Sequence, residues 1–173
     1  PVEKWPDIMQ GYVRILLEAR RYVYIETPYF LPTETVMSAM RIAALAGVDV
    51  RIMIPRHGDA KFVEWASRSY VFETIQAGVK VYLYRPGFLH SKLLVCDDIV
   101  CTCGSTNVDF RSFENNFEAN AFIYDRETTL RFKQIFMDDI KECNFVTERM
   151  ISRKRPFAQR LWESVVRLLS PLL

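Results

Sequence analysis

A histidine and a lysine stand two residues apart in a segment that is otherwise typical of a β-strand, His90-Ser91-Lys92-Leu93-Leu94-Val95-Cys96-Asp97. Side chains alternate between the two faces of a strand, so His90 and Lys92 are predicted to point the same way. An imidazole can attack phosphorus or transfer a proton, and a nearby ammonium neutralises phosphoryl oxygens. The pair therefore indicates chemistry on a phosphate ester.

Short polar side chains follow the next predicted strand and could complete such a site. The Ser105 hydroxyl and the Asn107 amide stand after Gly104, a residue that lets the backbone approach a ligand closely. Glu118 opens a further strand and is a candidate to hold the second nitrogen of the His90 ring. Each residue also has an ordinary alternative, in which the polar groups only stabilise a loop and Glu118 is a plain strand carboxylate.

Composition bounds the class of protein. The 173 residues suit one domain with a sizeable core, half of them are hydrophobic, and 23 Lys and Arg stand against 21 Asp and Glu. A net charge of +2 gives no bulk attraction to polyanions, so we expect no nucleic-acid partner without a local basic patch. No apolar stretch has the length of a membrane span. The chain opens on Pro1, and we therefore expect it to be an excerpt of a longer protein.

The four cysteines give no metal-binding pattern. There is no C-x-x-C pair and no second cluster of Cys and His, which argues against zinc. We expect them to be small buried hydrophobes in a reducing compartment. They are Cys96, Cys101, Cys103 and Cys143.

Helices and strands alternate in the first half of the chain, which predicts crossover units and a largely parallel sheet covered on both faces. The second half differs, because Asp97-Asp98 is typical of a tight turn between two paired strands. A metal at this acidic pair is a weaker interpretation than the turn. The predicted helices are 8–19, with Asp7 as a candidate cap, then 33–46, 60–77, 126–145 and 157–169, and the predicted strands are 22–25, 48–54, 79–84, 89–96, 99–103 and 117–124.

The last residues, 151–173, form a basic amphipathic segment. Such a helix can lie in an anionic membrane interface, or its apolar face can pack on the preceding domain, 1–150. The sequence leaves both readings open.

The spacing of these residues resembles the signature of the phospholipase D superfamily. His90-x-Lys92 is followed after four residues by Asp97, then by Gly104-Ser105 and Asn107, and Glu118 stands where the family has a histidine-orienting glutamate. The resemblance is closest to the bacterial cardiolipin synthases and covers nearly the whole chain. The segments that carry it are 26–32, 47–55, 88–92, 107–113, 116–118 and 168–173.

The resemblance implies a phospholipase D-like α/β/α sandwich with a mixed, largely parallel sheet. Family members of this type carry two histidine motifs in two similar domains, whereas this chain has one and resembles the C-terminal half. The expected partners are thus an N-terminal phospholipase D domain of the same protein or a second copy of the chain. The isolated domain is expected to be inactive or to need a second motif. The implied location is the cytoplasmic side of a bacterial cell membrane.

The implied reaction makes cardiolipin from two phosphatidylglycerols through a phosphohistidine intermediate, with no metal and no cofactor. By analogy the first motif supplies the nucleophile and His90 is the general acid and base. The implied catalytic group is His90, Lys92, Asp97 and Glu118, of which Asp97 is expected to support the architecture. Ser105 and Asn107 would bind phosphate; Arg111 would do so too, or would pair with Asp109 or Glu114.

Two other functions stay open. Some superfamily members have a single motif and act as homodimeric nucleases, although the near-neutral charge argues against that here. A catalytically silent half that binds anionic lipid headgroups is the third reading. Cleavage of single-stranded DNA would favour the nuclease, and cardiolipin formation that survives His90→Ala would favour the silent half.

Overall fold

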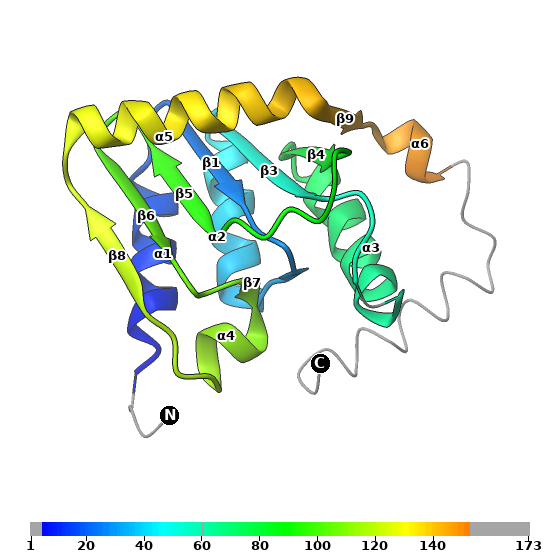
Figure 1. Ribbon diagram of the computed structural model, residues 1–173, viewed down its shortest axis with the longest axis horizontal. Helices are drawn as coiled ribbons and strands as arrows, with labels where there is room; N and C mark the ends of the chain where they lie inside the picture. Colours follow the sequence, from blue (N-terminus) through cyan, green and yellow to red (C-terminus); the bar gives the residue numbers. More distant parts are fainter. Residues whose placement is uncertain (1–4, 60, 153–173) are drawn as a thin grey trace.

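The computed structural model describes residues 5–59 and 61–152, which form an α/β sandwich. Figure 1 shows a central sheet with helices on both sides, as the sequence predicted. In chain order the elements are α1 (Asp7–Glu18), β1 (Tyr22–Glu26), β2 (Phe30–Leu31), α2 (Glu34–Leu45), β3 (Asp49–Pro55), α3 (Lys61–Gln76), β4 (Lys80–Tyr84), β5 (Leu93–Cys96), β6 (Val100–Gly104), β7 (Val108–Asp109), α4 (Phe110–Glu114), β8 (Asn120–Ile123), α5 (Arg126–Asp139), a 3₁₀ turn (Ile140–Glu142), β9 (Cys143–Val146) and α6 (Glu148–Ser152).

The main sheet has seven described strands in the order β8-β6-β5-β1-β3-β4-β9. Only the β1–β3 and β3–β4 pairs are parallel, and the other four pairs are antiparallel. The mixed sheet is confirmed, but its parallel share is smaller than the sequence predicted. Of the antiparallel pairs, only β5–β6 is closed by a tight turn; β5 also pairs with β1, and β8 and β9 pair with β6 and β4 after longer connections through α4 and α5.

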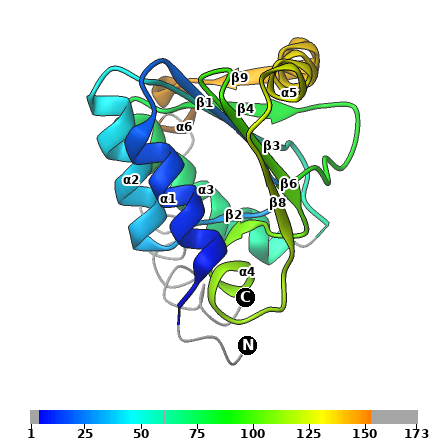
Figure 2. The ribbon, with the colours of Figure 1, turned by 90° about the vertical axis from the view of Figure 1, so that its left-hand side faces the viewer.

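Each face of the sheet carries its own core. Helices α1, α2 and α3 pack on one face, and α5 crosses the other (Figure 2). Strand β1 is buried along its whole length because it lies in the middle of the sheet with helices above and below. Its alternate residues divide between the cores: Val23 and Ile25 face α1 to α3, whereas Tyr22 and Tyr24 face α5. This central strand ends beside the start of β5.

Local signals explain where several of the elements begin and end. The Thr33 hydroxyl accepts a hydrogen bond from Val36 N at 3.4 Å and caps α2. Asp97 and Asp98 both have positive φ, which confirms the tight turn between β5 and β6. The predicted cap at Asp7 is wrong by one residue, because the N-cap of α1 is Pro6 and Asp7 lies in the first helical turn.

Longer-range pairing changes two predicted segments. The predicted helix 126–145 ends at Asp139, and Cys143–Val146 instead form β9 against β4. The segment between the predicted strands 99–103 and 117–124 contains β7 and the short helix α4, which the sequence did not predict. Strand β7 pairs with β2 in a separate two-stranded sheet. Both changes depend on partners far away in the sequence, which periodicity cannot reveal.

Within the described part of the chain, no helix has the length and apolarity needed to cross a bilayer. The predicted tail helix 157–169 lies outside the described residues, and only the first two residues of the segment 151–173 are described, as the end of α6. Cys96 and Cys101 are buried free thiols, as expected, whereas Cys103 and Cys143 are half-buried.

Candidate functional site

His90 and Lys92 lie in the extended segment just before β5, which begins at Leu93 rather than at the predicted 89. The Lys92 ammonium is 3.1 Å from His90 Nε2 and donates a hydrogen bond of 2.9 Å to the carbonyl oxygen of His90. An ammonium is a donor only, so this contact is a hydrogen bond in the tautomer of the neutral ring that carries its proton on Nδ1. The unprotonated nitrogen and the positive charge thus lie side by side.

The charge on Lys92 is set by two opposing influences. Partial burial lowers its pKa, and the negative charges of Glu118 and Asp109 raise it. Asp109 ends β7 and Glu118 lies just before β8, so both carboxylates are far from Lys92 in the sequence. The site is therefore built from three segments of the chain, those that carry Lys92, Asp109 and Glu118.

Glu118 contacts Ser105 and Asn116 instead of His90. The Ser105 hydroxyl donates to Glu118 Oε2, and Asn116 Nδ2 donates to Oε1 at 3.4 Å. Among the described residues no hydrogen bond joins Glu118 to His90, so the expected orienting contact is not made in this structure. The reason is local: Ser105 N donates to Ala119 O at 3.0 Å, which brings Ser105 directly across from the chain beside Glu118.

Gly104 is required at the end of β6 by the approach of β8. A Cβ atom there would lie 2.1 Å from the carbonyl oxygen of Ala119 and 2.2 Å from Asn120 Oδ1. Both atoms are fixed, because Asn120 pairs with Gly104 in the sheet and its Oδ1 accepts from Thr106 N at 3.2 Å. The glycine thereby allows Ser105 to lie next to Glu118.

Asn107 and the residues after it form a small buried structure rather than an open row of donors. Asn107 Nδ2 donates to Ser112 Oγ at 3.2 Å, and its Oδ1 is buried without a hydrogen-bond partner among the described residues. Asp109 caps α4 by accepting from Ser112 N at 2.6 Å. Burial raises the pKa of Asp109. Arg111 lies exposed on α4.

Asp97 lies at the opposite end of β5 from His90, in the turn that leads to β6. Its carboxylate accepts from three backbone N–H groups, those of Arg20 at 2.6 Å, Arg21 at 2.9 Å and Tyr22 at 2.8 Å. It is only 4% exposed. Asp97 thus ties the start of β1 to the end of β5 and does not contact the phosphate-site candidates.

An aromatic row beside His90 was absent from the predicted site. The Phe88 and His90 rings are 5.7 Å apart between centroids, and Phe88 is 6.1 Å from Tyr29. The Tyr29 hydroxyl donates to Asp59 Oδ2 at 2.6 Å. Burial, then this bond, raises the pKa of Tyr29 to about 12. The signal was present in the sequence, since both aromatic residues fall in segments that resemble the family.

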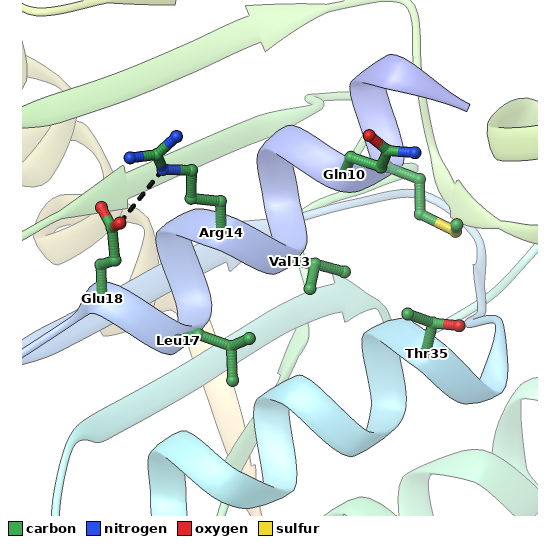
Figure 3. Close-up of a pocket in the computed structure, with 7 residues that line it drawn as sticks. Gln10, Val13, Arg14, Leu17, Glu18 and Thr35 are labelled. Carbon is green, nitrogen blue, oxygen red and sulfur yellow. Dashed lines mark hydrogen bonds and ion pairs between the residues drawn. The ribbon is translucent and has the colours of Figure 1, made fainter. Parts of the chain in front are cut away.

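A groove between α1 and α2 involves none of these residues. Figure 3 shows Val13 and Leu17 projecting from α1 toward α2, with Thr35 at the start of α2. Arg14 and Glu18 form an ion pair of 3.1 Å along its edge. In the described part of the chain, no group of three or more His, Cys, Asp or Glu side chains could hold a metal ion.

Sequence comparison gives close relatives. A family model described as the PLD-like domain of cardiolipin synthase matches residues 12–140. The cardiolipin synthase of Clostridium perfringens (strain SM101) is 45% identical over 167 residues, which are 96% of this chain and 35% of that protein. The cardiolipin synthase of Geobacillus sp. (strain WCH70) is 44% identical over 173 residues, all of this chain and 34% of that protein. The chain spans about a third of the length of these curated relatives.

Solved structures share the fold. Phosphatidylserine synthase from Haemophilus influenzae superposes with a TM-score of 0.76 at 18% identity, covering 96% of this chain and 45% of that one. Nuc, a phospholipase D family member from Salmonella typhimurium, gives a TM-score of 0.69 at 18% identity, covering 80% of this chain and 90% of that one. At such identities the likeness shows the architecture alone.

Proposed function

The chain belongs to the cardiolipin synthase family of phospholipase D-like domains, and on that premise we propose that it supplies one half of the active site of a phosphatidyltransferase. The substrates are two phosphatidylglycerol molecules and the products are cardiolipin and glycerol. The observation that carries the proposal is the contact between His90 Nε2 and the Lys92 ammonium on an exposed ring, where an anionic phosphodiester can replace the ring nitrogen as the partner of the ammonium. This combination suits attack on, or proton transfer at, an anionic phosphodiester.

The reaction proceeds in two displacements. A histidine nitrogen attacks phosphorus, a P–N bond forms, and the P–O bond to the glycerol headgroup breaks as the other histidine donates a proton to the leaving oxygen. That second histidine then takes the proton from a hydroxyl of the next phosphatidylglycerol, whose oxygen displaces the nitrogen. We assign the proton-transfer role to His90, so the nucleophile comes from another motif.

The other site residues serve the phosphoryl group. Lys92 neutralises its non-bridging oxygens, and Ser105 and Asn107 donate hydrogen bonds to them after release from Glu118 and Ser112. Glu118 then turns to the Nδ1–H of His90 and holds the ring orientation. Asp97 contributes only through the architecture of β1 and β5.

The second motif comes from a partner. We propose an N-terminal phospholipase D domain of the same protein, in keeping with the one third of the relatives' length that this chain spans. A second copy of the chain is the alternative source. The site works at the cytoplasmic surface of a bacterial membrane, where its lipid substrates are found.

Product analysis tests the proposal. The protein, expressed with the sequence that flanks this chain in its gene, is incubated with phosphatidylglycerol in mixed micelles, and lipids and free glycerol are quantified by mass spectrometry. We expect one glycerol released per cardiolipin formed. Glycerol release without cardiolipin would indicate hydrolysis, and cleavage of single-stranded DNA without lipid turnover would support the nuclease instead.

A further inference from the structure

Glu26 is a charged residue buried behind the segment that carries His90. It ends β1, pairs with Leu93 at the start of β5, and is 1% exposed. Residues directly opposite in an antiparallel pair share a face, so Glu26 lies on the α5 side with Leu93. Ser91 precedes Leu93 by two residues and faces the same way, between His90 and Lys92 (strands β1 and β5 in Figure 1).

The surroundings of Glu26 leave its charge unbalanced. Neither oxygen makes a hydrogen bond of normal geometry with the described residues, although the Ser91 hydroxyl lies near enough to favour the charged form. The groups that face it from other elements are acidic or neutral. Asp139 at the end of α5 acts on Glu26, and Glu26 in turn acts on Tyr84 of β4 and Cys143 of β9. A buried carboxylate without a cation is costly.

We propose that Glu26 is a positioning residue for the reaction at His90: its buried carboxyl group lies behind Ser91 and supports the segment that presents His90 and Lys92. The inference rests on the proposed function. The contact acts on the face of the sheet opposite the two reactive side chains, so Glu26 itself touches no substrate. Its effect reaches the site through the backbone of residues 90–92.

The protonation state of Glu26 decides whether this support persists. Burial, with a smaller contribution from Asp139, raises the pKa of Glu26 to about 7. Above that pH the buried negative charge can be relieved by water entering between the ends of β1 and β5. Such an opening displaces His90 and Lys92, and displacements of this kind lower kcat steeply.

Two substitutions separate positioning from bulk packing. Glu26→Gln keeps the shape of the side chain and a polar group beside Ser91, but it cannot ionise. Glu26→Leu keeps a side chain of similar size and removes the polar group. The readout is kcat and KM for cardiolipin formation across the neutral pH range, with Glu127→Gln, an exposed glutamate on α5, as the matched control. His90→Gln is assayed in parallel to test the proposed function itself.

We expect the wild-type kcat to fall as pH rises through about 7, and this fall to be absent in Glu26→Gln, because the amide has no proton to lose there. Glu26→Leu lowers kcat by about 10- to 100-fold with little change in KM. An unchanged pH profile of kcat in Glu26→Gln, or a wild-type kcat in Glu26→Leu, overturns the inference about Glu26. The proposed function still stands in that case if His90→Gln has lost activity. Full activity in His90→Gln overturns both.

Discussion

The Lys92 ammonium lies 3.1 Å from Nε2 of His90 and at the same time bonds the carbonyl oxygen of that residue. The lysine is therefore folded back over its neighbour, with its charge at the nitrogen that would react. Partial burial lowers the pKa of Lys92, and the negative charges of Glu118 and Asp109 oppose that shift in part. The arrangement places a lone pair and a positive charge within reach of one phosphoryl group.

Removing the charge on Lys92 should impair the reaction without unfolding the domain. Lys92→Met retains the aliphatic stem and loses the ammonium, and we expect kcat for cardiolipin formation to fall by about 10²- to 10³-fold because developing charge on the phosphoryl oxygens is no longer stabilised. Lys80→Met, at another partly exposed lysine, is the control. Equal rates for the two variants would show that Lys92 has no part in the chemistry.

Asp97 should matter for stability rather than for turnover. Asp97→Asn keeps the side-chain shape and tolerates the positive φ of the turn, but it loses the charge that accepts three backbone hydrogen bonds. We expect the free energy of unfolding to fall by about 1–3 kcal/mol in a denaturant titration. The folded variant should keep a kcat close to that of the wild type, and a large loss of kcat at unchanged stability would place Asp97 in the chemistry.

Even a substitution of Gly104 by alanine should destabilise the protein. A methyl group there meets the Ala119 carbonyl oxygen and Asn120 Oδ1, so β8 must move away from β6. We predict that Gly104→Ala costs about 1–3 kcal/mol of stability. Activity should fall as well, because Ser105 shifts with the strand end. A crystal structure of the variant with an undisturbed β6–β8 pair would refute the steric argument.

The raised pKa of Glu26 should make the free energy of unfolding depend on pH near neutrality. Its folded pKa of about 7 lies above the ordinary value of 4.5, so the folded state binds more protons between these two values. The contribution to stability is complete below pH 4.5 and is lost as pH rises through about 7, a change of about 3 kcal/mol. The difference in unfolding free energy between wild type and Glu26→Gln, measured across this range, should show that slope. A pH-independent difference would mean that Glu26 does not titrate there.

Local chemistry explains which parts of the fold could be read from the sequence. The Thr33 cap and the Asp97-Asp98 turn depend on residues within one turn, so their types alone predicted α2 and the β5–β6 hairpin. Strand β9 could not be predicted, because its helix-compatible sequence is held by β4, some sixty residues earlier in the chain. The same holds for β2 and β7, two-residue strands that exist only as a pair.

The site was predictable in its residue types and less so in its contacts. The spacing of His90 and Lys92 predicted that they share a face, and their side chains do meet. The spacing could not predict that Ser105 would bond Glu118, because that contact depends on the register of β6 with β8. Glu26 was overlooked as a functional residue, although a glutamate that ends an otherwise apolar strand is itself a signal.

The most direct test of the account is the turnover of a His90→Gln variant beside a His57→Gln variant, since the chain has two histidines and His57 follows β3 in a loop. Both are measured as cardiolipin formed per molecule of the complete protein from phosphatidylglycerol. The account predicts that His90→Gln loses at least about 10³-fold in kcat while His57→Gln stays near wild type. Turnover by His90→Gln at the wild-type rate would contradict the claim that this ring transfers the proton in the reaction.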